Sequence, residues 1–175
     1  IMKKIQKIIF LMLYYSIAKN LPNYSFPGGK IYNWFRIFCL KRIIQIGSSC
    51  RIMSNVYIGD GNDITIGNNC RINENVRLDN VRMGNHIMIA RESILLGKSH
   101  NYKELEIPME SQGNMTTEKI IIKDNVWLGL RSIIMPGIKI ERGTIIGAGA
   151  VVTKNTESNG IYGGVPAKLI RYRNK

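Results

Sequence analysis

The chain has 175 residues, 45% of them hydrophobic and 21% charged, which is enough to bury a core and excludes both a disordered chain and a bundle of membrane-spanning helices. Twenty-five Lys and Arg against twelve Asp and Glu leave a net charge of +13, which favours anionic partners. Three Cys and two His exclude a disulfide framework and a histidine-rich metal site, so we expect no metal requirement.

The first nineteen residues differ from the rest of the chain. Lys3, Lys4 and Lys7 precede the apolar run 8–15, and Lys19 closes the segment. The run is too short for a membrane-spanning helix, which needs about 20 residues. It is typical of a secretory signal, with 16–18 as a cleavage site, or of a helix that packs on the domain or contacts a membrane surface. Prolines, glycines and aromatic residues then complete a non-repetitive cap over residues 1–45.

A six-residue repeat follows the cap. From Ile122 onward an aliphatic side chain returns every six positions, at Leu128, Ile134, Ile140, Ile146 and Val152. A small or apolar residue stands four positions after each. The same pattern runs through Ile46, Ile52, Ile58, Ile66, Ile72, Leu78, Met83, Ile89 and Leu95, with Asn62 and Arg82 as poor fits.

A period of six is neither the helical 3.6 nor the alternation of one long strand. It predicts short strands joined by tight corners, three of which form a triangular coil of about 18 residues that stacks about 4.8 Å from the next coil. We therefore expect an all-β solenoid over residues 46–157, with Leu128 stacked on Ile146. Cys50 and Cys70 fall on inward positions and are expected to be buried thiols.

Two departures from the repeat are informative. The polar stretch 99–119 interrupts the register, and a loop of this length in a compact repeat fold is usually functional. The register ends after Thr156, so residues 158–175 are expected to form a turn and a short, helical basic tail.

Three motifs within the repeat region carry a family resemblance. They are Asp124–Gly129 (DNVWLG), Gly147–Lys154 (GAGAVVTK) and Gly164–Arg171 (GVPAKLIR). With the repeat, they resemble the hexapeptide-repeat acyltransferases over about residues 45–172, especially the galactoside and maltose acetyltransferases and the O-acetyltransferases of polysaccharide clusters. The resemblance implies a left-handed parallel β-helix, acetyl-CoA as co-substrate, and a homotrimer with active sites between subunits.

The resemblance also implies a catalytic base. Acetyl transfer to a hydroxyl needs a base for the proton and donors for the oxyanion. The stretch from Gly84 to His100 is similar to the family's approach to its catalytic histidine, so His100 is expected to be the base and His86 a corner residue. The group that orients His100 stays open between a backbone carbonyl and four carboxylates: Glu92, Glu104, Glu106 and Glu110.

Other site residues follow from the same resemblance. The backbone around Gly129 and Leu130 is expected to hold the oxyanion, and Ala148 to meet the pantetheine arm. The nucleotide end of acetyl-CoA is assigned to Thr153, Lys154, Lys168 and Arg171. Asn73, Asn101 and Tyr102 are expected to bind the acceptor, while Asn75, Asp79 and Asn80 also carry groups suited to hydroxyls.

These features predict a cytoplasmic acetyl-CoA-dependent O-acetyltransferase acting on a sugar hydroxyl, on a cell-surface polysaccharide or its precursor, with a membrane contact through residues 1–19. The alternatives are a serine or other small-molecule acetyltransferase of the same fold and a non-enzymatic basic β-helix scaffold. A zinc-dependent carbonic anhydrase of this fold would need three histidine ligands, and the chain has two. No nucleic-acid-binding motif is present, and we expect no nucleic-acid partner.

Overall fold

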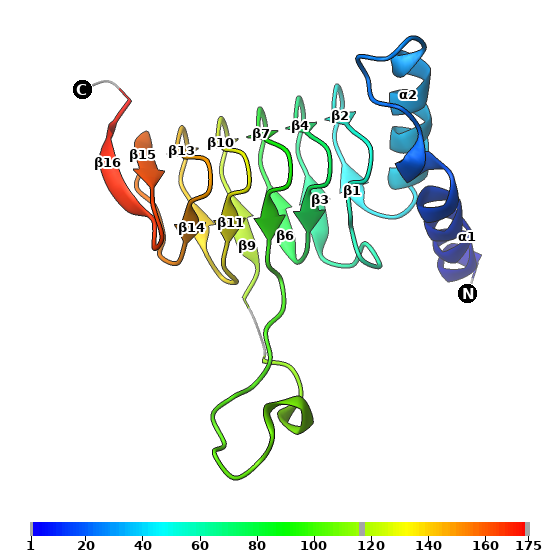
Figure 1. Cartoon of the computed structure of the whole chain (residues 1–175). Coiled ribbons are helices and arrows are strands. Elements are labelled where there is room, and N and C mark those ends of the chain that lie inside the picture. Colours follow the sequence, from blue (N-terminus) through cyan, green and yellow to red (C-terminus); the bar gives the residue numbers. More distant parts are fainter. Residues whose placement is uncertain (1, 116–117, 174–175) are drawn as a thin grey trace.

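A computed structural model describes residues 2–115 and 118–173, and most of them wind into a triangular prism of stacked coils (Figure 1). The helices α1 (Met2–Ser16), η1 (Ala18–Asn20) and α2 (Gly29–Leu40) lie at one end of the prism. The C-terminal strands lie at the other end, and residues 99–115 and 118–119 belong to an arm that leaves the prism sideways. Residues 116–117 of the expected loop and 174–175 of the expected tail lie outside the described part.

Three sheets form the faces of the prism. Sheet A contains β1 (Gln45–Ile46), β3 (Ile64–Ile66), β6 (Val81–Met83), β9 (Ile120–Ile122) and β12 (Lys139–Ile140). Sheet B contains β2 (Arg51–Ile52), β4 (Arg71–Ile72), β7 (Met88–Ile89), β10 (Trp127–Leu128), β13 (Ile145–Ile146), β15 (Gly160–Gly163) and β16 (Lys168–Tyr172). Sheet C contains β5 (Arg77–Leu78), β8 (Ile94–Leu95), β11 (Ile133–Ile134) and β14 (Val151–Val152).

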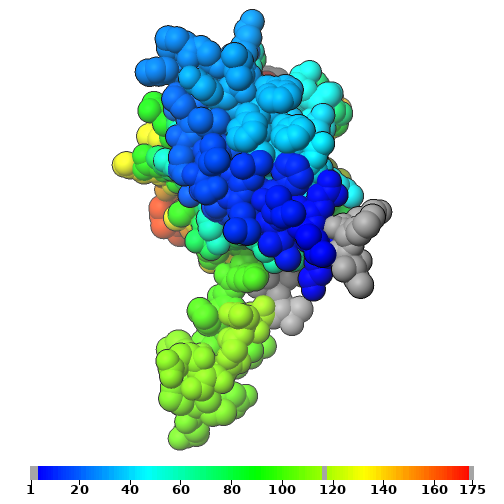
Figure 2. Space-filling view, turned by 90° about the vertical axis from the view of Figure 1, so that its right-hand side faces the viewer, coloured from blue at the N-terminus to red at the C-terminus, as the bar shows by residue number. Residues whose placement is uncertain are grey.

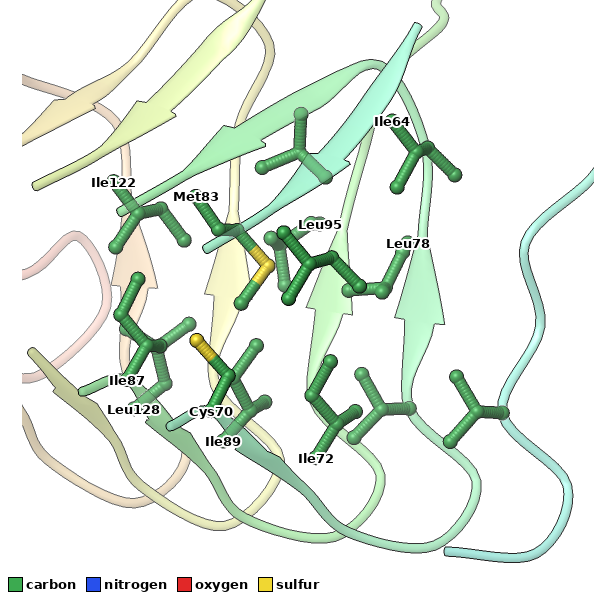
Figure 3. Packing of buried hydrophobic residues seen from close by; sticks show 14 of the residues in the cluster. Ile64, Cys70, Ile72, Leu78, Met83, Ile87, Ile89, Leu95, Ile122 and Leu128 are labelled. Atoms are coloured by element: carbon green, nitrogen blue, oxygen red, sulfur yellow. The ribbon is translucent and has the colours of Figure 1, made fainter. Parts of the chain in front are cut away.

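The six-residue repeat sets which side chains point inward. Leu128 stacks on Ile146 and Ile134 on Val152 in parallel register, as the repeat predicts. Ile72, Ile89, Leu95 and Leu128 of the repeat are fully buried and fill the prism in stacked rows (Figure 3), whereas Ile46 at the first coil is partly buried. Each coil therefore buries its apolar side only against the coils above and below it.

Tight corners join the strands, and residues that tolerate a positive φ occupy them. Asn69, Asn75, His86 and Asn125 have φ between 57° and 59°. This left-handed region suits Asn better than most other side chains, because its short polar group bonds the local backbone. His86 is thus an exposed corner residue, which confirms its expected place.

The N-terminal segment is a helix that packs on the prism. Tyr14 of α1 is fully buried and its hydroxyl donates to the Val56 carbonyl oxygen at 2.8 Å. Arg36 of α2 is also buried and donates to the carbonyls of Leu21, Pro22 and Ile52. These bonds fix the segment between the helices and close the first coil. None of the helices among the described residues is both long enough and apolar enough to cross a bilayer.

The prediction of a helical tail is wrong. Residues 160–163 continue the coil as β15, parallel to β13, and β16 returns antiparallel to β15. The physical reason is that β13 leaves an edge of unpaired backbone groups, which the next six-residue unit can still fill. Tyr162 extends the buried row beyond Ile146, so the repeat runs past Thr156.

Candidate functional site

The edge between sheets B and C carries four of the expected site residues: Asn73, Gly129, Leu130 and Ala148. At this edge the backbone N–H of Asn73 donates to Ile89 O at 3.0 Å, and that of Gly129 donates to Ile146 O at 2.8 Å. Because β4, β7 and β10 are successive neighbours in sheet B, Asn73 lies two coils, or about 10 Å, from Gly129. Ala148 lies on the next coil beyond Gly129. We call this column of corners the B–C edge.

Gly129 allows the coils at this edge to approach closely. A β-carbon at Gly129 would stand 2.6 Å from the Ala148 nitrogen and 2.7 Å from Ile146 O. Ala148 and Gly149 are exposed on the outer side of the corner, and a β-carbon at Gly149 would meet nothing within 4 Å. Small residues therefore leave a smooth, open backbone surface on this edge.

The expected oxyanion donor can be narrowed to one residue. The Gly129 N–H is used in the hydrogen bond to Ile146 O, and its carbonyl accepts from the Ser93 hydroxyl at 2.9 Å. Leu130 is exposed, and its carbonyl accepts from Gly149 N at 2.8 Å. Within the described part of the chain, no hydrogen bond takes up the Leu130 N–H. Leu130 is thus the residue at this corner with a main-chain donor left for a ligand.

The residues expected to reach a nucleotide gather at the C-terminal end of the prism. Thr153 and Lys154 are exposed immediately after β14, and Lys168 is exposed at the start of β16. The two segments are connected because Ala167 N donates to Val151 O at 2.8 Å. Arg171 is exposed further along β16. Lys and Arg at this end provide the charge that phosphate groups require.

His100 lies on the other side of sheet C, at the edge between sheets C and A. It forms an antiparallel bridge with Asn114, and flanking bonds join Asn101 N to Gly113 O at 3.0 Å and Met115 N to Ser99 O at 2.8 Å. The stem of the arm is therefore ordered by a short two-stranded ladder. The imidazole itself is exposed.

The arm beyond His100 is held together by Gln112. Its side-chain amide donates to the carbonyls of Glu104 and Ile107, at 2.7 Å each, and accepts from Glu104 N at 3.1 Å. Tyr102 is 60% exposed and Leu105 is 93% exposed. The arm thus has an internal structure, and it projects from the prism with these side chains exposed (Figure 2).

A pocket of about 560 Å³ lies beside the stem of the arm. Asn114, the bridge partner of His100, lines it together with Tyr57, Asp60 and Asp79. Arg77 donates to Asp79 at 2.7 Å and lies 4.6 Å above the Tyr57 ring. Carboxylates and an aromatic face suit a polyhydroxylated ligand.

The sequence predictions only partly anticipated this pocket. Asp79 and Asn80 were expected to have groups suited to hydroxyls, whereas Tyr57 and Asp60 were missed. The available signal was the break in the six-residue register at residues 60–63, which produces the widened corner. Asn73 does not line this pocket but a second one, of about 370 Å³, on the outer face of sheet B.

A single chain does not bring all the expected site residues together. His100, Asn101 and Tyr102 belong to the arm at the C–A edge, whereas Gly129, Leu130 and Ala148 belong to the B–C edge. Sheet C separates the two groups.

Of the four carboxylates considered as partners of His100, Glu92 is used elsewhere. It accepts from Arg131 Nε at 2.6 Å on the B–C edge. No carboxylate hydrogen-bonds His100 among the residues that the structure describes.

The buried thiols offer no nucleophile. Cys50 and Cys70 are 6% and 0% exposed, and their Sγ atoms donate to Gly67 O and Gly84 O respectively. Interaction with Cys70 lowers the pKa of Cys50, and interaction with Cys50 together with burial raises the pKa of Cys70. Both lie inside the prism, as the repeat predicts. No group of three or more His, Cys, Asp or Glu among the described residues is arranged to hold a metal ion.

Comparison with known proteins agrees with this geometry. The bacterial transferase hexapeptide model, of six repeats, matches residues 119–154. The chain is 29% identical over 135 residues to the galactoside O-acetyltransferase of Lactococcus lactis subsp. lactis (strain IL1403), covering 75% of this chain and 64% of the relative. It is 32% identical over 129 residues to the galactoside O-acetyltransferase of Escherichia coli (strain K12), covering 72% of this chain and 62% of the relative.

A solved structure supports the same relationship. A galactoside acetyltransferase in complex with coenzyme A superposes with a TM-score of 0.78 and 29% identity, covering 97% of this chain and 82% of that one. The fold is a left-handed parallel β-helix of about six turns. Residues 119–154 thus carry the bacterial transferase hexapeptide repeat, and the chain is similar to hexapeptide-repeat acetyltransferases over most of its length. It spans somewhat less than two thirds of the length of these two galactoside O-acetyltransferases.

Proposed function

We propose that the chain is an acetyl-CoA-dependent O-acetyltransferase that acts on a sugar hydroxyl of a cell-surface polysaccharide or its precursor. The observation that carries the proposal is the position of His100. The bridge to Asn114 fixes this exposed histidine beside a pocket lined by Asp60 and Asp79, whose carboxylates suit sugar hydroxyls. The relatives' names, galactoside O-acetyltransferase, agree with a sugar acceptor.

In this proposal His100 acts as a general base and transfer is direct. Its imidazole takes the proton of the acceptor hydroxyl while the hydroxyl oxygen forms the new ester bond to the acetyl carbon. The carbon–sulfur bond of the thioester breaks, and the leaving sulfur receives a proton. No cysteine takes part, because Cys50 and Cys70 are enclosed in the prism.

The B–C edge has the features that acetyl-CoA requires. The Leu130 N–H is positioned to stabilise the oxyanion that forms during transfer. The exposed backbone around Ala148 and Gly149 leaves room for the pantetheine arm, since neither position carries a large side chain. Lys154, Lys168 and Arg171 supply positive charge for the phosphates at the C-terminal end. Coenzyme A in the solved galactoside acetyltransferase supports this donor.

We further propose that the active site forms between copies of the chain, in a homotrimer. Sheet C separates His100 from Leu130 within one chain, so His100 of one copy is expected to meet the B–C edge of a neighbour. Leu105 at 93% exposure and Met109 at 65% exposure then have an apolar surface to contact. Cyclic symmetry gives such an assembly three equivalent sites and no open interface.

Co-expression of two inactive variants tests the function and the shared site together. His100→Ala lacks the base, and Ala148→Trp blocks the cofactor edge at an exposed corner without entering the core. If the two halves come from neighbouring copies, random mixing leaves an intact His100 facing an intact Ala148 in about a quarter of the sites. Transfer from labelled acetyl-CoA to a panel of sugars should recover to about a quarter of the wild-type rate.

The outcomes separate the two proposals. No recovery in mixed assemblies, with active wild-type protein, would mean that each site lies within one chain. No transfer from acetyl-CoA to any sugar by the wild-type protein would overturn the proposed activity.

We place the enzyme in the cytoplasm, since acetyl-CoA is made and used there.

A further inference from the structure

Helix α1 is apolar on two opposite faces. One face, with Phe10, Leu11 and Tyr14, packs against the hydrophobic core. The opposite face is exposed and also apolar: Ile5 is 53% exposed, Ile8 49%, Ile9 55% and Met12 68%. These four residues follow the spacing i, i+3, i+4, i+7 of a single helical stripe. A helix that is apolar on both sides is expected to bury both of them.

Helix α2 extends this apolar surface. Its inner residues Arg36 and Cys39 are buried, whereas Ile31 is 68% and Trp34 62% exposed on the outer side. Trp34 stacks on Phe38 with ring centroids 5.6 Å apart, and Phe38 contacts Phe10 of α1 edge-on at the same distance. The two helices lie side by side and together cover the end of the prism (Figure 2). We call their exposed side the cap face.

The charge of this region has one sign. Residues 1–59 contain nine Lys and Arg and no Asp or Glu, whereas the remaining 116 residues contain sixteen and twelve. Lys4, Lys30, Lys41 and Arg42 are exposed on the two helices or directly after them. Arg42 lies 4.0 Å above the Phe38 ring, which places its cation beside the aromatic cluster.

We infer that the cap face docks on an anionic lipid bilayer. Apolar side chains that insert shallowly, an exposed Trp and flanking Lys and Arg are the groups that hold a helix in the plane of a membrane interface. A second copy of the chain is disfavoured, because two cap faces would bring their positive charges together with no carboxylate between them. Duplex nucleic acid is disfavoured, because its phosphate backbone has no apolar surface to cover the isoleucine stripe.

Docking of the cap face would orient the enzyme. The strands β15 and β16, which carry Lys168 and Arg171, lie at the far end of the prism from the cap (Figure 1). The arm with His100 leaves the prism at its side. The cofactor end would therefore face away from the bilayer, and the histidine would stand at an intermediate height. This inference does not depend on the acetyl acceptor, since vesicle binding is measured without any substrate.

Co-sedimentation of the full chain with vesicles tests the inference. Wild-type protein should bind vesicles of phosphatidylglycerol and phosphatidylcholine and bind phosphatidylcholine vesicles weakly. Ile9→Ser/Met12→Ser removes apolar surface at constant charge, and Lys30→Gln/Lys41→Gln removes charge at constant apolar surface. Each pair of substitutions should weaken binding more than tenfold. For the lysine pair the reason is that each lysine beside anionic lipid contributes about fivefold to binding. For the Ile9 and Met12 pair the reason is the loss of the apolar surface that inserts into the bilayer. All four residues are exposed, so the fold should tolerate the changes.

Matched controls lie far from the cap. Val165→Ser removes an apolar side chain that is 72% exposed, and Lys123→Gln removes an exposed charge, and neither should alter binding. In a Trp127→Phe background, Trp34 fluorescence should shift to the blue on addition of anionic vesicles. Absence of wild-type binding, equal losses in the controls, or an unchanged Trp34 spectrum would each overturn the inference. A loss of assembly mass in Ile9→Ser/Met12→Ser, without vesicle binding by the wild type, would identify a second copy as the occupant.

Discussion

Gly129 lies directly against Ala148 on the next coil: a β-carbon at Gly129 would be 2.6 Å from the Ala148 nitrogen. The contact is between backbones, so no side-chain rotation relieves it. The same approach brings Gly149 N within 2.8 Å of Leu130 O. The hydrogen bond joins the two coils at the corner that carries the Leu130 N–H. The shape of the proposed cofactor edge therefore depends on the missing side chain at position 129.

Gly129→Ala should destabilise the protein and impair transfer. The added methyl group forces the coils apart, and overpacking of this kind costs about 1–3 kcal/mol. Gly149→Asn is the matched control for stability, because a β-carbon there meets no atom and its φ of +69° suits Asn. Urea denaturation measures the stability of both variants, and transfer kinetics measure the activity of Gly129→Ala. Equal stability of the two variants would contradict the steric account.

His100→Ala should lower kcat about 10²–10⁴-fold, which is the usual contribution of a general base. Affinity for acetyl-CoA and the assembly mass should not change, because the imidazole is exposed and acts on the acceptor hydroxyl rather than on the cofactor. His86→Asn is the control: His86 has φ +57°, which Asn adopts readily, so activity should be retained. Steady-state kinetics and calorimetric binding of acetyl-CoA distinguish the two histidines. Similar losses in both variants would remove His100 from its proposed role.

Much of the prism could be predicted from sequence because its contacts obey a local rule. A period of six fixes which residue of each short strand points inward, and that pattern by itself predicts the burial of Ile72, Leu128 and Cys70. The tail was missed for a different reason. Tyr162 joins the stack by covering an edge left by β13, and such an edge is a property of the assembled fold rather than of the local sequence.

The proposed site was predictable only as separate motifs. His100 and the Gly129–Leu130 corner were both identified by resemblance, but the distance between them along the chain carries no information on which edge of the prism each occupies. The pocket beside Asn114 depends on Tyr57 and Asp60, which a widened corner brings to the stem of the arm. These residues come together only when the register between the coils is known, so neither residue by itself indicated the pocket.

Leu105→Glu should weaken the assembly without unfolding the chain. Leu105 is 93% exposed on an arm held by Gln112, so the substitution removes no contact within one chain. If the arm rests on a neighbour, a buried carboxylate there costs several kcal/mol and shifts the protein toward monomers. Sedimentation at several concentrations measures the shift. Lys103→Glu, also exposed on the arm, is the charge control and should leave the assembly mass unchanged.

Arg36→Met should destabilise the cap by about 2–4 kcal/mol. Its guanidinium is fully buried and donates to the carbonyls of Leu21, Pro22 and Ile52. A hydrogen bond to a charged group contributes about 1.5–3 kcal/mol. The expected loss is smaller than the sum of the three bonds, because water can bond the carbonyls that the substitution leaves unpaired. Methionine keeps much of the volume, so the loss reports the polar contacts. Hydrogen exchange should show faster opening of residues 17–28 than in wild-type protein. Unchanged protection there would show that packing alone holds the segment.

Tyr14→Phe should change how stability depends on pH. Burial raises the pKa of the Tyr14 phenol well above its usual value near 10, because the phenolate would lose its hydration inside the cap. Above about pH 10 the unfolded chain releases this proton and the folded chain keeps it. The free energy of unfolding therefore falls as pH rises, by up to about 1.4 kcal/mol per pH unit from this one group.

Tyr14→Phe removes this contribution, and it also removes the 2.8 Å hydrogen bond to Val56 O. At pH 8 the variant should be less stable than wild type by about 1–3 kcal/mol, since the Val56 carbonyl is left without its donor. Between pH 9 and 11 the difference should shrink by about 1.4 kcal/mol, because only the wild type must keep a buried phenol protonated. Urea denaturation at each pH, analysed as the difference between the two proteins, cancels the titration of all other groups. A difference that stays constant with pH would show that Tyr14 is hydrated in the folded protein, in conflict with its complete burial.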